Sequence, residues 1–216
     1  MKLYHYYRSS ASYRVRIALA LKQLNWEPIS VHLGNGEHRE DAYVRLSPSR
    51  TVPLLMTEEA TVSQSLAIIE YLDEIHPHIP MLPPGPLDRA FVREIALDIA
   101  CEIHPLNNTR VLTFLTGLGL SDKQRSAWYR HWTESGLLVV EQKLQRSGKA
   151  GRFCFGDTPS MADCVLIPQI FNAKRMNCDL TPLQKIHEVF DACMALPAFA
   201  DTQPSAFDPA NHPNKP

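Results

Sequence analysis

The sequence predicts a two-part chain, in which a small α/β unit at the N-terminus is followed by an all-helical remainder. Strand-like and helix-like segments alternate up to residue 76, and beyond residue 86 apolar residues recur only at helical spacing. Residues 77–86 hold five prolines, which cannot occupy the interior of a helix or sheet. We therefore predict a domain of residues 1–76, a linker of residues 77–86, a helical domain of residues 87–205 and a loosely attached tail of residues 206–216.

The predicted α/β unit begins with the aromatic, β-prone segment 3–7. A helix follows, because Val15, Ala18 and Leu19 repeat at helical spacing, and Ser12 is its expected N-cap. Residues 27–33, 52–56 and 61–63 are predicted as three further strands, the second of which opens on Pro53. The apolar run from Leu66 to about residue 76 completes the unit as a second helix.

The helical remainder is predicted as four helices. The first is a long helix over residues 87–116, kinked at Pro105, and the second covers residues 121–146. Ser160 and Asp163 have the spacing of a capping box, which opens a helix to about residue 173. The last helix is expected over residues 182–195.

Composition excludes several classes of protein. A net charge of −1 with interspersed charges argues against a nucleic-acid binder that works through a bulk positive field. No segment approaches the roughly 18–20 apolar residues of a membrane span, and no secretion signal is visible. Five irregularly spaced cysteines form neither a disulfide framework nor a zinc site. We expect a cytoplasmic protein without a metal.

The predicted strand-to-helix corner at residues 8–12 has the composition of an anion site. Backbone N–H groups at a helix N-terminus attract anions, and serine hydroxyls and Arg8 add donors and charge. The glycines of phosphate-binding loops are absent. Ser9 and Ser12 stand at the spacing of the redox Cys-x-x-Cys motif, so disulfide exchange is excluded. The corner can instead stabilise a thiolate that another molecule supplies.

Five motifs in order resemble the zeta class of the glutathione transferases, over nearly the whole chain. They are residues 7–19, 64–72, 103–108, 156–163 and 179–182. The resemblance implies the glutathione transferase architecture, an α/β thioredoxin-like N-terminal domain plus an all-α C-terminal domain, and a homodimer. It also implies a cis peptide bond at Val52-Pro53. Two departures are Ala11, where relatives often carry cysteine, and segment 47–51, whose sequence differs from the common form.

The activity implied by the resemblance is the glutathione-dependent cis-trans isomerisation of maleylacetoacetate. A thiolate adds to the double bond, rotation follows, and elimination restores the alkene as the trans isomer. Ser9 is our candidate donor to the glutathione sulfur and Ser10 the second choice, because serine can donate to an anion but is no base at its ordinary pKa. Arg8 and Arg175 are expected to bind the carboxylates of the small dicarboxylic keto-acid substrate.

Glutathione is the expected cofactor, and its binding residues follow from the resemblance. They are Ser9, Ser10, Ala11, Ser12, His38, Val52, Gln64, Ser65, His104, Asn108, Thr109 and Arg110. Arg14 and Arg16 are interpreted as structural or solvated. Three alternatives remain open: a maleylpyruvate isomerase, a general glutathione transferase or dehalogenase acting on small electrophilic acids, and a non-catalytic binding module with this fold.

Overall fold

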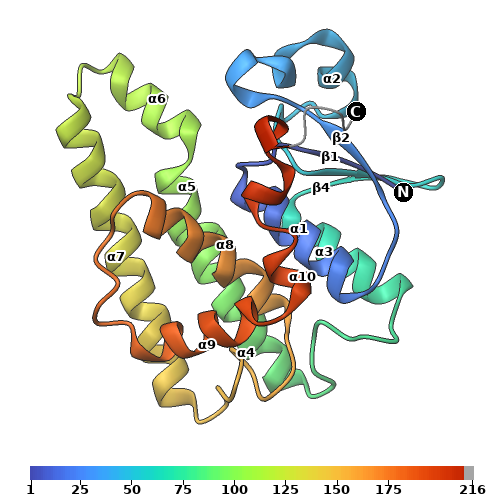
Figure 1. Ribbon diagram of the computed structural model, residues 1–216, viewed down its shortest axis with the longest axis vertical. Helices are drawn as coiled ribbons and strands as arrows, with labels where there is room; N and C mark the ends of the chain where they lie inside the picture. The colour runs from blue at the N-terminus through green and yellow to red at the C-terminus, as the bar shows by residue number, and fades with distance from the viewer. Residues whose placement is uncertain (212–216) are drawn as a thin grey trace. The chain divides into compact units, whose positions relative to one another are not determined.

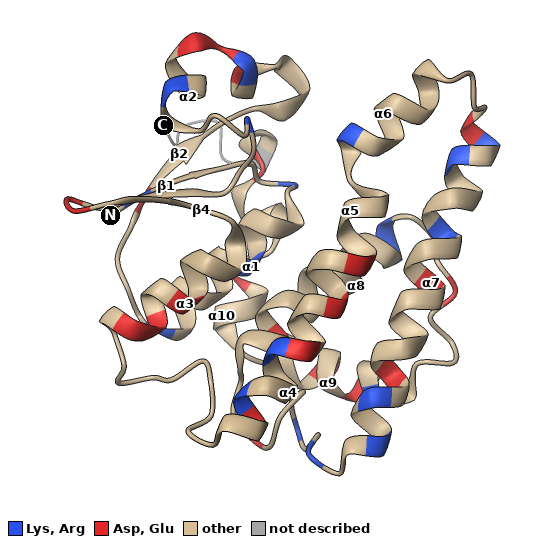
Figure 2. Ribbon diagram, turned by 180° about the vertical axis from the view of Figure 1, so that it is seen from behind, with Lys and Arg blue, Asp and Glu red and all other residues tan. Residues whose placement is uncertain are grey.

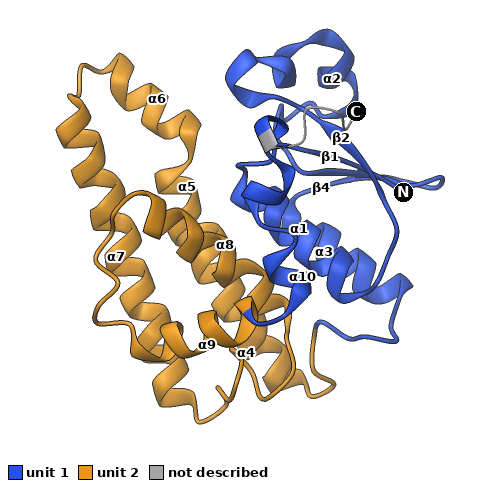
Figure 3. Cartoon of the chain, viewed as in Figure 1, with its two compact units in different colours: residues 1–81, 195–216 blue, residues 82–194 orange. Residues whose placement is uncertain are grey.

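The computed structural model describes residues 1–211, and by backbone contacts these residues form two units (Figure 3). Unit 1 comprises Met1–Met81 together with the C-terminal segment that begins at Ala195. Unit 2 comprises Leu82–Met194. The sequence analysis instead placed residues up to 205 in the helical domain. The return of the chain to unit 1 depends on contacts between residues far apart in sequence, which a local sequence pattern does not reveal.

A mixed sheet of four short strands forms the centre of unit 1 (Figure 1). The strands are β1 (Lys2–His5), β2 (Glu27–Ser30), β3 (Leu54–Met56) and β4 (Thr61–Ser63), in the spatial order β2-β1-β3-β4. Strands β1 and β2 are parallel, because helix α1 (Ser10–Leu21) provides the crossover between them. The other two pairings are antiparallel. All four strands match predicted ones, although β1 and β2 end earlier than predicted.

Helices cover both faces of this sheet (Figure 1). On one face, α1 and α3 (Ser65–Ile75) bury an apolar cluster: Leu3, Val15, Leu19, Leu55, Ile68 and Leu72. On the other face lie the 3-10 turns η1 (Leu33–Asn35) and η2 (Glu37–Arg39) and helix α2 (Asp41–Leu46). Tyr43 of α2 packs there with Val31 and Leu54. Strand residues therefore point alternately into two cores, as the period of two in a strand requires.

Unit 2 is entirely helical. Its elements are α4 (Pro86–Leu97), the π-helical segment η3 (Asp98–Ile103), α5 (His104–Asn107), α6 (Thr109–Gly117), α7 (Asp122–Ser147), α8 (Met161–Arg175) and α9 (Gln184–Met194). The predicted capping box of α8 is confirmed, since Asp163 Oδ2 accepts from the N–H of Ser160 at 2.8 Å. The predicted single helix over 87–116 is wrong: it breaks at Asn108, whose backbone is extended.

The cause of that break lies around Pro105. Proline lacks an N–H and cannot continue the α-helical hydrogen-bond pattern. In the structure the wider π-helical turn of η3 precedes it, and α5 ends two residues after it. Asn108 then starts a new helix, because its side-chain oxygen accepts from the N–H of Arg110 at 3.1 Å.

The C-terminal segment packs onto unit 1 through α10 (Pro197–Ala200), η4 (Pro204–Phe207) and η5 (Pro209–Asn211). The Tyr13 hydroxyl donates to the Phe199 carbonyl at 2.7 Å, and Phe207 stacks on Trp26. These contacts differ from the predicted loosely attached tail of residues 206–216, whose last five residues lie outside the described part of the chain. Proline content indicated a tail, but it carries no information about the burial of Phe207.

Positively and negatively charged residues are interspersed along the ribbons of both units (Figure 2). Among residues 1–211, no helix is both long and apolar enough to cross a membrane. The same residues contain no group of three His, Cys, Asp or Glu side chains that could hold a metal ion.

Replacing Lys22 by methionine is expected to lower the free energy of unfolding by about 3 kcal/mol. The Lys22 ammonium is almost fully buried and donates to Asp73 at 2.7 Å, to the His76 carbonyl at 2.9 Å and to the Ile79 carbonyl at 2.7 Å. Without it, the Asp73 carboxylate loses its cationic partner and keeps only the N–H of Met81, and the two carbonyls lose the Lys22 donor. Lys2→Met is the matched control, since its pair with Glu27 is exposed and should contribute under about 1 kcal/mol. If urea titrations gave the same loss in the free energy of unfolding for Lys22→Met and Lys2→Met, the prediction would be contradicted.

His5 is expected to make unit 1 sensitive to acid. Burial, and then the charge of Arg16, lower its pKa from 6.5 to about 3. Between about pH 6.5 and 3 the unfolded chain therefore binds a proton that the folded chain does not, so stability falls as pH falls through this window. The contribution is up to about 1.4 kcal/mol per pH unit. Urea titrations of the His5→Gln variant should show a shallower loss below about pH 6, and an unchanged pH slope would refute this assignment.

Candidate active site

The strand register brings three of the predicted segments to one end of the sheet. Strand β1 runs toward the strand-to-helix corner at residues 8–12, here called the serine corner. Tyr4 in β1 pairs with Leu54 at the start of β3. Leu54 in turn pairs with Ser63 at the end of β4. The serine corner after β1, Val52 before β3 and Ser65 after β4 therefore lie at the same edge, because antiparallel neighbours run in opposite directions.

Ser9, not Ser12, is the N-cap of α1, which corrects the sequence prediction. Ser9 has an extended backbone (φ −72°, ψ 119°), and its Oγ accepts from the Ser12 N–H at 3.2 Å. The carbonyl of Ser9 accepts from the Tyr13 N–H at 2.9 Å. The N–H groups of Ser10 and Ala11 have no acceptor inside the helix, as is general for a first turn. An anion at this corner therefore meets backbone donors together with the Ser9 hydroxyl proton.

Ser12 and Ser10 have different places in the corner. The fully buried Ser12 accepts from the Tyr6 N–H at 3.4 Å, which ties the helix to the chain leaving β1. The helix begins earlier than predicted because Ser12 is used in this way. Ser10 is the first residue of α1 and is also buried. Arg8 is exposed in the turn before the cap.

Helix α3 begins with an open N-terminus at Ser65. Gln64, which precedes it, has a positive φ of 72°, and no side chain caps the helix. No acidic residue stands in its first turn. A positive φ at a residue other than glycine is strained, and such residues cluster at functional sites. The open end and the strained residue both agree with anion binding here.

Arg14 is a residue at this edge that the sequence analysis missed. Its side chain is buried, and Nη1 donates to Ser65 Oγ at 3.2 Å, which joins α1 to α3. Arg14 follows Ser10 by four positions and so shares its helix face. That spacing could have indicated a place near the serine corner, but an arginine in an amphipathic helix is usually solvated.

The Val52-Pro53 peptide bond is cis, as the resemblance implied. Val52 is buried in the second apolar cluster, so its backbone position is fixed by packing. His38 lies in η2, where its Nε2 accepts from Arg39 Nε at 3.3 Å. Burial lowers the pKa of His38, and the charges of Arg39 and Arg50 lower it further. The lowered pKa favours the uncharged form of the His38 ring, so Arg39 and Arg50 carry the positive charge near it.

Five of the predicted site residues lie in unit 2. His104, the first residue of α5, and Asn108, the extended residue that follows this helix, are hydrogen-bonded to each other (Nε2 to Nδ2, 3.3 Å). Thr109 and Arg110 open α6, and Arg175 is the exposed last residue of α8. The roles of these residues stay predictions.

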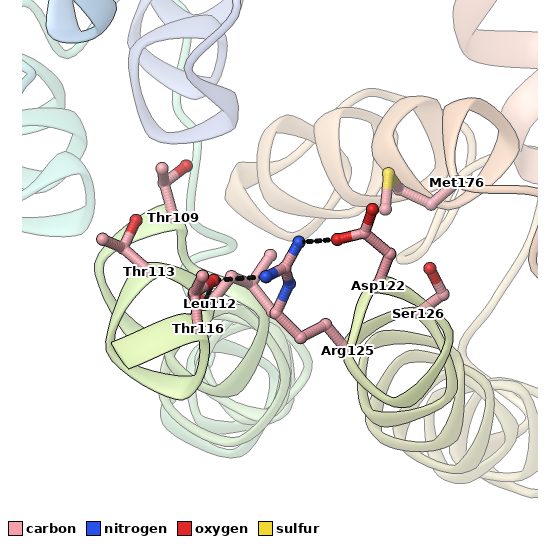
Figure 4. Close-up of a pocket in the computed structure, with 8 residues that line it drawn as sticks. All are labelled: Thr109, Leu112, Thr113, Thr116, Asp122, Arg125, Ser126 and Met176. Carbon is pink, nitrogen blue, oxygen red and sulfur yellow. Dashed lines mark hydrogen bonds and ion pairs between the residues drawn. The ribbon is translucent and has the colours of Figure 1, made fainter. Parts of the chain in front are cut away.

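A cavity of about 470 Å³ lies in unit 2 between α6, the start of α7 and the end of α8 (Figure 4). Of the predicted residues, only Thr109 lines it. Arg125 is the one cation of its lining, and Figure 4 shows that it is bonded to Asp122 and to Thr116. A cavity whose single cation is already paired with a carboxylate is poorly suited to a dianion. We therefore do not assign the dicarboxylate to it.

The buried cysteines cannot supply a nucleophilic sulfur. Burial raises the pKa of Cys154 and Cys193 well above the ordinary range, and Asp163 beside them raises it further. Cys178 is only partly buried, and this burial raises its pKa to about 11. A thiol is a nucleophile only when ionised, so these side chains are inert at neutral pH. All five cysteines belong to unit 2, so the serine corner in unit 1 has no thiol of its own and its thiolate chemistry requires a sulfur from another molecule.

The comparisons with known proteins agree with this fold. Residues 3–84 match the family model for the glutathione S-transferase N-terminal domain. Maleylacetoacetate isomerase of Pseudomonas aeruginosa is 44% identical over 219 residues, which cover 100% of this chain and 99% of that protein. The architecture is that of a glutathione transferase, with a thioredoxin-like N-terminal domain and a helical C-terminal region.

Two solved structures narrow the class. The holo structure of a maleylpyruvate isomerase, described as a bacterial zeta-class glutathione S-transferase, superposes with a TM-score of 0.94 at 42% identity and covers 96% of this chain and 99% of its own. The structure of maleylacetoacetate isomerase of Methylobacterium extorquens, with bound malonate and glutathione, superposes with a TM-score of 0.91 at 34% identity. The match covers 94% of this chain and 96% of that chain. The chain belongs to the zeta-class glutathione transferases, the family of these isomerases.

Proposed function

We propose that this protein is a glutathione-dependent cis-trans isomerase that converts maleylacetoacetate into its trans isomer, fumarylacetoacetate. The observation that carries the proposal is the meeting of two donor-rich helix N-termini, those of α1 and α3, at one sheet edge. Membership of the zeta class supports it, as does the malonate and glutathione bound in the Methylobacterium extorquens enzyme.

The residues at this edge fit glutathione. The open N-terminus of α3 and the Ser65 hydroxyl suit the γ-glutamyl carboxylate, and the backbone of Val52, before the cis proline, suits the peptide. When bound, glutathione supplies the thiolate that adds to the double bond, permits rotation and is then eliminated. The chain has no ionisable thiol of its own at this edge, so the fit is to an external sulfur.

Ser9 performs the electrostatic part of the reaction. Its oxygen already accepts from the Ser12 N–H, so its proton is free to donate to the sulfur. Hydrogen bonds to the ionised form and the positive end of α1 lower a thiol pKa. Ser10 is the second choice for this role. Arg8 and Arg175 bind the substrate carboxylates, since a guanidinium pairs with a carboxylate through two parallel hydrogen bonds.

The alternative function, a maleylpyruvate isomerase, is supported by the structural similarity to the enzyme of that name. Kinetics with both keto-acids and glutathione would separate the two substrates, and chloroacetate would test the dehalogenase alternative. We expect the higher kcat/KM for maleylacetoacetate. Faster chloride release from chloroacetate than isomerisation of either keto-acid would favour the dehalogenase. If the protein turned over none of these three compounds, the interpretation as a non-catalytic binding module would be favoured.

The assembly and location complete the proposal. We place the protein in the cytoplasm, which suits its five irregularly spaced cysteines, and we expect a homodimer, as the zeta-class resemblance implies. Sedimentation at micromolar concentration should give twice the mass of 24.4 kDa. A monomer at that concentration would contradict the assembly but leave the chemistry standing.

A further inference from the structure

The hydrogen bond between Arg14 and Ser65 links the two helix N-termini of the candidate site. Arg14 is 2% exposed and Ser65 is 5% exposed, so solvent has little access to either. The Nη1–Oγ distance is 3.2 Å, and the two residues are 51 positions apart in the chain. A buried polar contact between two helices at a ligand-binding edge can hold the helices, the ligand or both.

The direction of this hydrogen bond is fixed by chemistry. A guanidinium has only donors, so Ser65 Oγ must be the acceptor. The hydroxyl carries a single proton, which therefore points away from Arg14. A serine without such a partner can rotate its proton among several directions. Arg14 thus leaves Ser65 with its proton aimed elsewhere, ready for a second acceptor.

The end of α3 provides the place for that acceptor. Helices α1 and α7 begin with serines whose side chains accept from the first turn, and Asp163 reaches back at the start of α8. Helix α3 has neither a capping side chain nor an acidic residue in its first turn, and the strained Gln64 precedes it. The first-turn N–H groups and the Ser65 proton together form a donor set for a carboxylate.

We propose that Arg14 is a positioning residue, which orients the Ser65 hydroxyl so that it donates to the γ-glutamyl α-carboxylate of glutathione. This inference rests on the proposed function, because it assigns that carboxylate to the end of α3. Arg14 acts through Ser65 and not by contact with the ligand. The residue would therefore set glutathione affinity and leave the chemistry at the sulfur to the serine corner.

Binding calorimetry with glutathione tests this assignment directly. The variants are Arg14→Met, Arg14→Lys, Ser65→Ala and the double variant Arg14→Met/Ser65→Ala. Arg45→Met is the matched control, since Arg45 is an exposed arginine of α2 in the same unit. We expect Arg14→Met to raise Kd about tenfold, the size of one hydrogen bond to a charged group. Ser65→Ala should do the same, the double variant should be no weaker than either, and Arg45→Met should bind normally.

A second ligand separates positioning from a purely structural role. In a glutathione analogue whose γ-glutamyl α-carboxylate is replaced by an amide, the proposed contact is weakened already in the wild type. Arg14→Met should then change Kd for the analogue less than twofold. Equal losses for both ligands, or additive losses in the double variant, would overturn the proposal.

Two further outcomes are also decisive. If Arg14→Met does not fold, Arg14→Lys, which keeps one donor, should bind glutathione more tightly than Ser65→Ala; equal or weaker binding would overturn the proposal. Wild-type protein that binds no glutathione at millimolar concentration would refute both the proposed function and this inference. Wild-type binding with unchanged Kd in Arg14→Met and Arg14→Lys would refute the inference alone.

Discussion

Replacing Ser9 by alanine is expected to lower the turnover number at least tenfold. The variant removes one charge-assisted hydrogen bond to the glutathione sulfur, and removing a single donor of this kind commonly costs a factor of ten or more. The ionised fraction of the bound thiol falls, whereas the glutathione contacts at α3 remain. The measurement is kcat with saturating glutathione, followed by the disappearance of maleylacetoacetate.

The same substitution also removes the N-cap of α1, which should lower the free energy of unfolding by about 1 kcal/mol. Ser9→Thr is the control, because threonine keeps both the cap and the donor. It should retain most of the activity. Ser10→Ala tests the second choice: if Ser9→Ala turns over normally and Ser10→Ala does not, the role belongs to Ser10.

Replacing Arg16 by methionine is expected to destabilise the protein by about 3–5 kcal/mol, because two carbonyls lose a charged donor and each such loss costs about 1–3 kcal/mol. The Arg16 side chain is fully buried in unit 1. It donates to the Thr202 carbonyl at 2.9 Å and to the Tyr7 carbonyl at 3.1 Å, and its guanidinium lies 4.7 Å from the centre of the Phe207 ring. Burial lowers its pKa to about 9, so it stays charged at neutral pH.

Methionine fills much of the volume but leaves both carbonyls without their donor. Urea unfolding measures the loss, and Arg146→Met, at an exposed position of α7, is the matched control with a change within about 0.5 kcal/mol. Phe207→Ala combined with Arg16→Met should show non-additive losses, because the two side chains touch. A loss below 1 kcal/mol for Arg16→Met, or full additivity, would contradict this account of the C-terminal segment.

The parts of the fold that local pattern determines could be predicted from the sequence. The apolar repeat that begins at Leu66 gave α3, and the spacing of Ser160 and Asp163 gave the start of α8. Pro53 indicated where the third strand begins, and β3 starts at the next residue, Leu54, which pairs with Tyr4 of β1. Most predicted residues of unit 1 meet at one sheet edge for the same reason, since they stand where predicted strands begin or end.

The features that depend on distant partners could not be predicted. Arg16 bonds to a carbonyl 186 positions away, so nothing near it in sequence indicates that it is buried. Arg14, which was interpreted as structural or solvated, likewise has its partner Ser65 at a distance of 51 positions in the sequence. The cap of α1 is a different case: Ser9, Ser10 and Ser12 all suit a helix N-cap, and only the bond from the Tyr6 N–H to Ser12 decides in favour of Ser9.

The central claim is that the corner between β1 and α1 keeps the sulfur of glutathione ionised. The most direct test is a pH titration of the ultraviolet thiolate absorbance of glutathione bound to the wild-type protein and to Ser9→Ala. The account predicts that the bound thiol titrates at least one pH unit below its solution pKa of about 8.5, and that this shift largely disappears in the variant. A bound thiol that titrates at its solution value in the wild-type protein would contradict the account.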